Sequence, residues 1–472
     1  MIEQLSAFVA RASYEDLSPE AQREIKVRVL DWLACAIGAI RYKPMRRLRN
    51  QIEEFGGRPP VTMVGGGKTS PDRAALYNGA LTRYLGFNDS HLSGNRSCHP
   101  SESIPAVLAA SEYAGASGRE FLTALAVAYQ VQCRLCEVAP AEGGGLGYNA
   151  PEYYATAAGV AKALNLNKEQ TANVISTAGV PNRLPRTPRE RAASRCRALP
   201  HPDSTFSIAQ SVLLAMSSVT DTGEAFEADE HLPEPVALDF EIDWVNENLE
   251  AVRRTAIKRY TADIHAQSAL EAILYLRERR PCHPDQIERI ELDTFDVAYD
   301  LLGSRGEGDG NQVRTMAEAY RSLPYLMAVA LLDGEVSPSQ YKPGRILRED
   351  ARSLMRKVMI RRDRDFSRRF PDEMPARVQI FLRDGQILTK EKRDYEGYFT
   401  RPFGWERAVE KFKDLTIFET GYELGQRIIE KVLDIEDTGV RELTELLAGR
   451  GQATKQKTWE KVSTPRRYRL AA

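Results

Sequence analysis

Three side chains that can move protons stand close together in one short stretch of the chain. Asp89, His91 and His99 lie between two apolar runs with helical spacing, residues 74–85 and 104–114. Histidine is the side chain whose ordinary pKa lies nearest neutrality, so it can both accept and donate a proton. We therefore predict a loop held between two helices, with His99 and Asp89 as catalytic groups.

Both ends of this loop carry helix signals. Gly86 follows the first apolar run and breaks it. At the other end, Ser101 or Ser103 can cap the second helix, because a hydroxyl at that position accepts a hydrogen bond from an otherwise unpaired backbone N–H. Two helices would thus hold the loop rigidly, as proton transfer requires.

A second group of ionisable residues occupies the segment from Lys258 to Gln267. A lysine beside a histidine suits a polycarboxylate substrate, because Lys258 can anchor a carboxylate while His265 moves a proton. The alternative interpretation is a surface lysine and an aspartate, Asp263, that caps a helix. Further along the chain, Tyr325 can donate a phenolic hydrogen bond to a substrate oxygen.

The elements that must position these groups fall into three blocks. Apolar periodicity is helical almost throughout from residue 119 to about residue 219. After His265, strand-like spacing appears, and Asp384-Gly385 is a hairpin signal between two such runs. Residues 405–412 and 424–433 then return to helical spacing. The predicted fold is mainly α with an inserted α+β domain.

Composition excludes several classes of protein. The 472 residues carry a formal net charge of −1, so no overall basic face favours nucleic acid. No run approaches the ~20 apolar residues that span a bilayer, and the N-terminus lacks a signal pattern. The six cysteines, scattered through apolar runs, indicate a cytoplasmic protein. Cys133 and Cys136 form the one close pair and fit buried apolar filling better than an iron–sulfur cluster, so we expect no metal.

Several segments resemble the MmgE/PrpD family of enzymes, which includes 2-methylcitrate dehydratases, cis-aconitate decarboxylases and an iminodisuccinate epimerase. The family pattern DFNDTW followed by HPS is similar to Gly86-Phe87-Asn88-Asp89-Ser90-His91 and then His99-Pro100-Ser101. FPAEFHSQTA resembles the segment that ends in His265-Ala266-Gln267, and SLPY with VALLDG matches residues 322–325 and 329–334. The resemblance covers most of the chain, from about residue 31 to residue 412.

This resemblance implies an architecture and a site. It implies a large all-helical domain, residues 1–264 and 396–450, and a smaller α+β lid domain, residues 265–395. The polar and basic composition of residues 451–472 predicts a flexible tail. The resemblance also implies a homodimer and no cofactor. Catalysis falls to His99, Asp89, His265 and Tyr325. Substrate binding falls to Lys258, Arg197, Asn88, Ser90 and Asp263.

The chain departs from the family pattern at five positions. Gly86 and Tyr320 stand where the pattern has aspartates, Arg321 and Asn149 where it has histidines, and Arg197 where it has a lysine. Arginine keeps the positive charge but does not give up its proton. These departures weaken the resemblance to the decarboxylase most. They also favour a catalytically silent member.

We therefore expect a cofactor-independent hydro-lyase similar to 2-methylcitrate dehydratase. It would act on a small di- or tricarboxylate by removing a proton α to a carboxylate. The alternatives are a decarboxylase or an epimerase on the same scaffold, or a catalytically silent protein that binds a carboxylate or a partner. Sequence does not separate the enzymes, because each begins with a proton removed next to a carboxylate.

The assignment of Arg197 predicts a kinetic signature. Arg197→Ala should raise KM far more than it lowers kcat, because a permanent charge binds ground state and transition state alike. One charged contact to a carboxylate contributes about 1.5–3 kcal/mol, on the order of 10–150-fold in affinity. Steady-state kinetics tests this, and a collapsed kcat at constant KM would mean that Arg197 stabilises charge that develops during the reaction.

Overall fold

The protein is described by a computed structural model that covers residues 2–94, 96–138, 150–179, 242–303 and 313–449. By its internal contacts the chain divides into two compact units. The first contains the described residues up to Tyr84, from Pro100 to Arg253, and from Gly404 onward. The second contains Leu85–His99 and the described residues of Arg254–Phe403.

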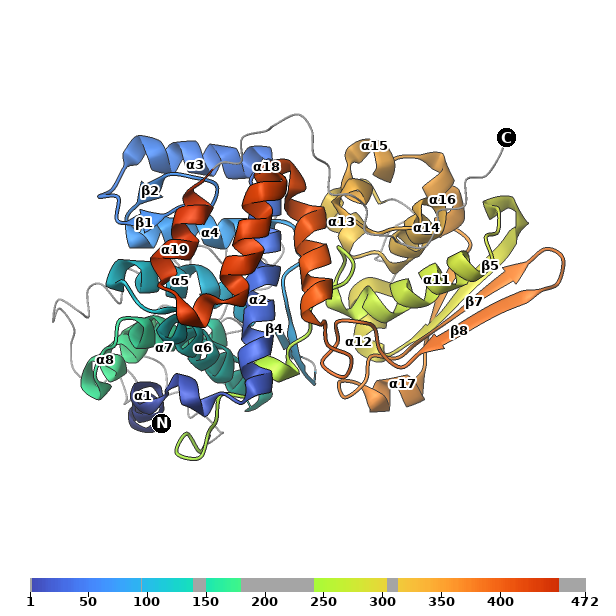
Figure 1. The fold of residues 1–472 in the computed structure, drawn as a ribbon. Coiled ribbons are helices and arrows are strands. Elements are labelled where there is room, and N and C mark those ends of the chain that lie inside the picture. The colour runs from blue at the N-terminus through green and yellow to red at the C-terminus, as the bar shows by residue number, and fades with distance from the viewer. Residues whose placement is uncertain (1, 95, 139–149, 180–241, 304–312, 450–472) are drawn as a thin grey trace, which may run out of the picture. The chain divides into compact units, whose positions relative to one another are not determined.

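The first unit is almost entirely helical (Figure 1). It carries one short hairpin, β1 (Val61–Thr62) with β2 (Lys68–Thr69). Its α-helices are α1 (Ile2–Arg11), α2 (Pro19–Ala39), α3 (Lys43–Phe55), α4 (Pro71–Tyr84), α5 (Ile104–Ala114), α6 (Gly118–Val138), α7 (Ala150–Ala163), α8 (Lys168–Gly179), α18 (Trp405–Leu433) and α19 (Val440–Ala448). Short 3-10 turns join some of them: η1 (Tyr14–Asp16), η2 (Pro100–Ser103) and η10 (Ile435–Asp437).

Helix α2 forms the centre of this unit. It begins at an N-cap, because the Ser18 hydroxyl accepts from the Ala21 N–H at 3.1 Å and Pro19 stands at the first helical position. The late helix α18 packs against α2, so an early and a late segment of the chain lie side by side (Figure 1). Lys411 Nζ lies 2.6 Å from Asp31 Oδ1 across this contact, and both side chains are buried.

One cap differs from the sequence expectation. Ser103 is the N-cap of α5, but its side chain makes no capping hydrogen bond. The Ser103 hydroxyl instead donates to the Pro100 carbonyl at 2.7 Å, because residues 100–103 form a 3-10 turn that runs directly into α5. The predicted serine cap is therefore wrong at Ser103, although the helix begins where the sequence indicates.

The second unit joins a four-stranded sheet to helices. The strand order is β6-β5-β7-β8, with β6 parallel to β5 and the other pairs antiparallel. The strands are β5 (Ile287–Thr294), β6 (Val358–Arg362), β7 (Ala376–Leu382) and β8 (Ile387–Lys392). The helices and turns are η5 (Ala251–Arg254, at the unit boundary), η6 (Ile264–Ala266), α11 (Gln267–Arg279), η7 (Pro284–Gln286), α12 (Asp296–Ala298), η8 (Tyr299–Gly303), α13 (Met316–Tyr320), α14 (Leu323–Asp333), η9 (Pro338–Tyr341), α15 (Pro343–Ile346), α16 (Glu349–Met355) and α17 (Arg364–Arg369).

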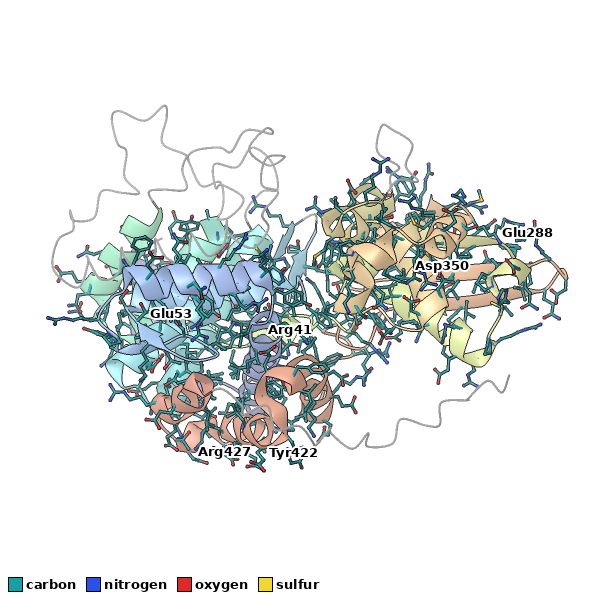
Figure 2. All side chains as sticks on the ribbon, turned by 90° about the horizontal axis from the view of Figure 1, so that it is seen from above. Arg41, Glu53, Glu288, Asp350, Tyr422 and Arg427 are labelled. Atoms are coloured by element: carbon teal, nitrogen blue, oxygen red, sulfur yellow. The ribbon has the colours of Figure 1, made fainter. Side chains whose placement is uncertain are left out.

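Alternation along the strands places the apolar core of this unit. Val378, Ile380 and Leu382 of β7 are buried, and they pack with α11 and α14 in one apolar cluster. Glu288 follows a buried isoleucine on β5 and projects outward (Figure 2). The predicted hairpin is confirmed, since β7 and β8 pair across the Asp384-Gly385 turn, where Gly385 has a φ of +85°.

The segment Leu85–His99 belongs to the second unit, whereas the resemblance placed it within the helical domain. It contains the hairpin of β3 (His91–Ser93) and β4 (Arg96–Cys98). Its link to the second unit is an antiparallel bridge. The Ser90 N–H donates to the Ala256 carbonyl at 2.8 Å, and the Ala256 N–H donates back at 2.7 Å. The candidate catalytic loop is thus held beside the segment that carries Lys258.

The predicted fold class, mainly α with an α+β domain, is confirmed. Among the described helices, none combines the length and apolar character needed to cross a lipid bilayer. Asn149, Arg197 with the arginine-rich stretch around it, and the predicted tail, residues 451–472, lie outside the described residues.

Gly397 gives a stability test of the backbone beside Lys258. A Cβ at this glycine would lie 2.3 Å from the Ile257 carbonyl oxygen, and its φ is +118°. Gly397→Ala should therefore lower the free energy of unfolding by about 2 kcal/mol or more, since strain and a backbone collision add. Gly385→Ala is the matched control, because it also has positive φ but meets nothing within 4 Å. Urea unfolding measures the free energy of unfolding of both variants, and equal losses in Gly397→Ala and Gly385→Ala would contradict this prediction.

Candidate active site

The His99 ring is oriented by the backbone of its own loop. Its Nδ1 lies 2.7 Å from the Asp89 carbonyl oxygen and 3.1 Å from Ser90 Oγ. A carbonyl oxygen can only accept a hydrogen bond, so Nδ1 carries the proton and Nε2 holds the lone pair in the neutral ring. His99 is half-buried. This loop therefore presents His99 in the tautomer of a base.

The residues before the hairpin are buried. Asn88, Asp89 and Ser90 are each at most 1% exposed. Asp89 orients His99 through its backbone carbonyl, and Ser90 joins the loop to Ala256. His91 is also buried, and its Nδ1 lies 3.3 Å from the carbonyl of Arg254, a contact that holds the hairpin in place.

His265 has a carboxylate partner. Its Nδ1 lies 2.8 Å from Asp263 Oδ1, and its backbone N–H donates to the same oxygen at 3.1 Å. The rings of Phe295 and Phe370 each lie 5.9 Å from the imidazole, centroid to centroid. A carboxylate on Nδ1 fixes the ring and its tautomer, and it can balance the charge of an imidazolium. Asp263 therefore serves to orient His265, rather than to bind substrate as the resemblance implied.

The electrostatics of Asp263 fit this role. Burial by itself would raise the pKa of the Asp263 carboxyl. The hydrogen bond from the His265 ring, the charge of that ring and the charge of Lys258 act in the opposite direction and hold the pKa well below its ordinary value. Asp263 is thus ionised at neutral pH, and it lies close enough to Lys258 to respond to its charge.

Lys258 lies deep in the second unit, with 3% of its surface exposed. Its Nζ donates to the Gly86 carbonyl at 3.0 Å and lies 3.4 Å from the Tyr320 hydroxyl. This position follows from the Ser90–Ala256 bridge. Because that pairing is antiparallel, the residues before Ser90 run beside the residues after Ala256. The lysine and the loop of His99 are therefore neighbours by backbone pairing.

A buried amide holds the turn between Lys258 and His265. Gln267 Oε1 accepts from the N–H groups of Arg259 and Tyr260 at 2.9 and 3.0 Å. Gln267 Nε2 donates to the carbonyls of Tyr260, Ala262 and Asp263 at 3.0, 3.2 and 3.3 Å. The side chain is completely buried. One residue thereby satisfies five backbone groups of the segment that carries the acid–base residues.

Tyr325 has a structural partner. Its hydroxyl donates to the Gln340 carbonyl, and the residue is completely buried in the apolar cluster of this unit. Burial raises the pKa of the Tyr325 phenol to about 12. We therefore leave Tyr325 out of the candidate site. Tyr320, which sequence marked only as a departure, is the tyrosine that lies against Lys258.

Seven of the nine predicted site residues thus gather on two paired segments of the second unit, residues 86–99 and 258–265. Arg197 lies outside the described residues, and Tyr325 packs elsewhere in the same unit. Sequence reasoning missed Gln267 and Tyr320. Gln267 could have been found because it lies inside the segment that resembles the family pattern. Tyr320 could have been found because it and Gly86 both depart from aspartates of that pattern.

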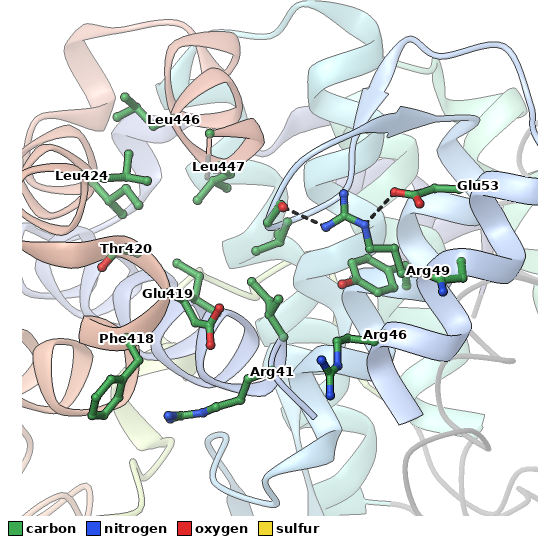
Figure 3. A pocket seen from close by; sticks show the side chains of 18 residues that line it. Arg41, Arg46, Arg49, Glu53, Phe418, Glu419, Thr420, Leu424, Leu446 and Leu447 are labelled. Carbon is green, nitrogen blue, oxygen red and sulfur yellow. Dashed lines mark hydrogen bonds and ion pairs between the residues drawn. The ribbon is translucent and has the colours of Figure 1, made fainter. Parts of the chain in front are cut away.

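A cavity of about 700 Å³ lies in the first unit and contains none of these residues (Figure 3). Arg41, Arg46 and Glu419 line it together with Leu424 and Leu447, and Arg49 is already paired with Glu53 at 2.7 Å. Among the described residues no histidine lines this cavity, so we do not assign proton transfer to it. In the described part of the chain, no group of three or more His, Cys, Asp or Glu residues is arranged to hold a metal ion.

Comparison with known proteins places this chain in a family. The chain matches the model of the MmgE/PrpD N-terminal domain over residues 3–241 and that of the MmgE/PrpD C-terminal domain over residues 260–435. The chain therefore belongs to the MmgE/PrpD family.

Three of its relatives are named 2-methylcitrate dehydratase. It is 24% identical to the 2-methylcitrate dehydratase of Escherichia coli (strain K12), over 92% of this chain and 94% of that protein. It is also 24% identical to a mitochondrial 2-methylcitrate dehydratase of Yarrowia lipolytica (strain CLIB 122 / E 150), over 81% of this chain and 77% of that protein. The chain is 24% identical to the 2-methylcitrate dehydratase of Cupriavidus necator, over 85% of this chain and 87% of that protein.

Replacement of Asp263 tests the Asp263–His265 pair through catalysis and through stability in acid. Asp263→Asn should lower kcat by about 10²–10⁴-fold with KM largely kept, because the amide no longer holds the imidazole in one tautomer. The lowered pKa of Asp263 also means that its ionised form stabilises the fold above about pH 4, and that this contribution is lost as the pH falls further.

Two measurements check this prediction. Steady-state kinetics gives kcat and KM. Urea unfolding at pH 7 and near pH 3 should show that wild type loses more of its stability on acidification than Asp263→Asn does. An Asn variant with wild-type kcat would show that His265 needs no carboxylate.

Proposed function

We propose that this chain is a cofactor-independent hydro-lyase of the 2-methylcitrate dehydratase type, acting on a small di- or tricarboxylate. The observation that carries the proposal is the pair of imidazoles with different Nδ1 partners, a carbonyl for His99 and a carboxylate for His265. Dehydration needs one group that removes a proton and another that donates one. The relatives named 2-methylcitrate dehydratase support the same reaction class.

In the proposed reaction, His99 Nε2 removes the proton on the carbon α to a carboxylate. Its Nδ1–H stays on the Asp89 carbonyl, so the lone pair of Nε2 is the basic site. The Asp89 carboxylate is the alternative base that the sequence left open. The electron pair of the broken C–H bond forms the new C=C bond as the C–O bond breaks.

The hydroxyl that departs needs a proton to leave as water. We assign this proton to His265, because the Asp263 carboxylate can balance the charge of the imidazolium before transfer. Atoms balance: one C–H and one C–O bond break, one C=C bond forms, and water is released. The proton taken by the base returns to solvent in a later step.

The substrate carries two or three carboxylates, and cations must hold them. Lys258 is buried and donates to the Gly86 carbonyl, at the start of the loop that carries His99, and a buried cation binds an anion more strongly than an exposed one does. We assign one carboxylate to Lys258 and, from the family pattern, another to Arg197. Asn88 and Ser90 are proposed to contribute polar contacts to the substrate.

The proposal is tested with a panel of citrate, 2-methylcitrate, aconitate, malate and tartrate in ²H₂O. A hydro-lyase should produce ultraviolet absorbance from a new double bond and should wash deuterium into the α position. Deuterium exchange without the absorbance would indicate an epimerase, and release of CO₂ from aconitate would indicate a decarboxylase. A protein that binds a carboxylate but exchanges no hydrogen is a silent member, and that result would overturn the proposal.

His99 is the residue on which proton removal is tested most directly. His99→Asn should keep the fold and most of the substrate affinity, and should lower kcat by about 10²–10⁴-fold. The pH profile of kcat should also lose a limb near neutrality, where an imidazole ordinarily titrates. A His99→Asn variant with full kcat and a lower Tm would contradict this assignment and leave Asp89 as the base.

His91→Asn is the matched control. His91 lies on the same hairpin, but its ring contacts the backbone of Arg254. Its replacement should lower Tm while the pH profile of kcat keeps both limbs. Loss of the same limb in both variants would mean that the profile reports the hairpin fold and not the His99 imidazole.

We further propose that the protein works in the cytoplasm as a homodimer and without a metal ion. The scattered cysteines support the cytoplasmic location, and the family resemblance supports the homodimer. The isolated cysteine pair, without a second pair at matching spacing, supports the absence of a metal. Light scattering on the purified chain gives the oligomeric state, and elemental analysis of the active protein gives its metal content.

A further inference from the structure

Two departures from the family pattern meet in space. Gly86 and Tyr320 both replace aspartates of that pattern, and they are 234 residues apart in sequence. A Cβ at Gly86 would lie 3.1 Å from Cε2 of the Tyr320 ring and 3.2 Å from its Cζ and Oη. The φ of Gly86 is +61°, a conformation that disfavours most other residues. The tyrosine ring therefore fills the space where a side chain at position 86 would begin.

The Tyr320 hydroxyl is tied to the lysine of the candidate site. It donates to the Gly86 carbonyl at 2.7 Å, and Lys258 Nζ donates to the same carbonyl at 3.0 Å. The two donors lie 3.4 Å from each other. Lys258 is 3% exposed and Tyr320 is 8% exposed, so these contacts are shielded from water.

The ring of Tyr320 is itself supported. It packs against Tyr341 with the ring centroids 6.1 Å apart, and the Tyr341 hydroxyl donates to the carbonyl of Thr261. Thr261 lies three residues after Lys258 on the same segment. The Tyr320 hydroxyl is therefore held directly by the Gly86 carbonyl. Its ring is supported by Tyr341, which is itself anchored to the Thr261 carbonyl.

We propose that Gly86 and Tyr320 form one coupled replacement whose purpose is to position Lys258 for a substrate carboxylate. A phenol hydrogen-bonds beside the ammonium without adding negative charge. An aspartate at position 86 or 320 would instead place a carboxylate there, which competes with an anionic substrate for the lysine. Tyr320 is thus a positioning residue that acts through Lys258, and the subsite that it builds takes a carboxylate.

This inference deepens the proposed function and rests on it for the identity of the bound group. Its geometry can be tested without any substrate. Gly86→Ala should lower Tm, and the loss should shrink in a Tyr320→Ala background, where the colliding ring is absent. Gly94→Ala is the matched control, because its φ is +52° on the same loop and its Cβ would meet nothing within 4 Å. Equal losses for Gly86→Ala in both backgrounds would overturn the coupling.

The role of the pair is tested by a double-mutant cycle on citrate binding, measured by isothermal titration calorimetry. Tyr320→Phe should weaken binding about 10-fold and Lys258→Met by about 10–150-fold, on the scale of hydrogen bonds to charged groups. The double variant should bind no more weakly than Lys258→Met alone. Tyr398→Phe removes another buried hydroxyl that donates to a backbone carbonyl, that of Pro371, and should leave citrate affinity unchanged.

The outcomes separate this inference from the proposed function. Additive losses, or wild-type citrate affinity in Tyr320→Phe, would overturn the positioning role. Absence of citrate binding by the wild-type chain would overturn the carboxylate subsite. Coupled, Lys258-dependent binding without turnover of any panel substrate would overturn the hydro-lyase alone and leave this inference standing.

Discussion

The candidate site depends first on one buried amide. Gln267 is the first residue of α11, and its side chain turns back to satisfy five backbone groups between residues 259 and 263. Unpaired buried N–H and C=O groups are each unfavourable by about 1–3 kcal/mol, so such a loop is stable inside a domain only when something satisfies it. Lys258 precedes this turn and His265 follows it. The helix that starts at Gln267 therefore also sets the separation of the cation and the acid–base group.

The two imidazoles have different partners, which fits the two roles proposed for them. Both rings are held at Nδ1, which leaves Nε2 as the atom that can exchange a proton. The partners differ in charge: a neutral carbonyl orients His99, whereas the Asp263 carboxylate can stabilise a protonated His265. Flanking rings of Phe295 and Phe370 lower the polarity around His265, so its carboxylate partner acts more strongly than it would in water. The arrangement suits a reaction that removes one proton and donates another.

Backbone pairing and apolar packing both support the loop that carries His99. The loop of His99 is paired with Ala256 by two backbone hydrogen bonds, and the small cluster of Leu92, Ala256, Ile264 and Phe295 packs beneath it. A rigid backbone matters because an acid–base group displaced by about 1 Å can lose on the order of 10²-fold in rate. The departures at positions 86 and 320 leave this frame in place, since the ring of Tyr320 occupies the volume that Gly86 vacates.

Sequence by itself determined the class of fold and the hairpin at Asp384-Gly385, and it singled out the two segments to which the proposed chemistry is assigned. These features are local: helical and strand periodicity, turn residues and short motifs act over a few residues, so they can be seen without the third dimension. The prediction that His99 and Lys258 belong to one site rests on the resemblance of both segments to those of a family.

The tertiary structure alone decided which partners these residues have. Tyr325 and Tyr320 are both tyrosines near one helix start, yet the first donates to a backbone carbonyl in the core and the second lies against Lys258. The pairing of Gly86 with Tyr320 joins positions 234 residues apart, and that of Ser90 with Ala256 also joins segments that are distant in sequence. Such contacts arise from packing between distant segments, and no local pattern encodes them, because each residue type is compatible with several surroundings until the fold closes around it.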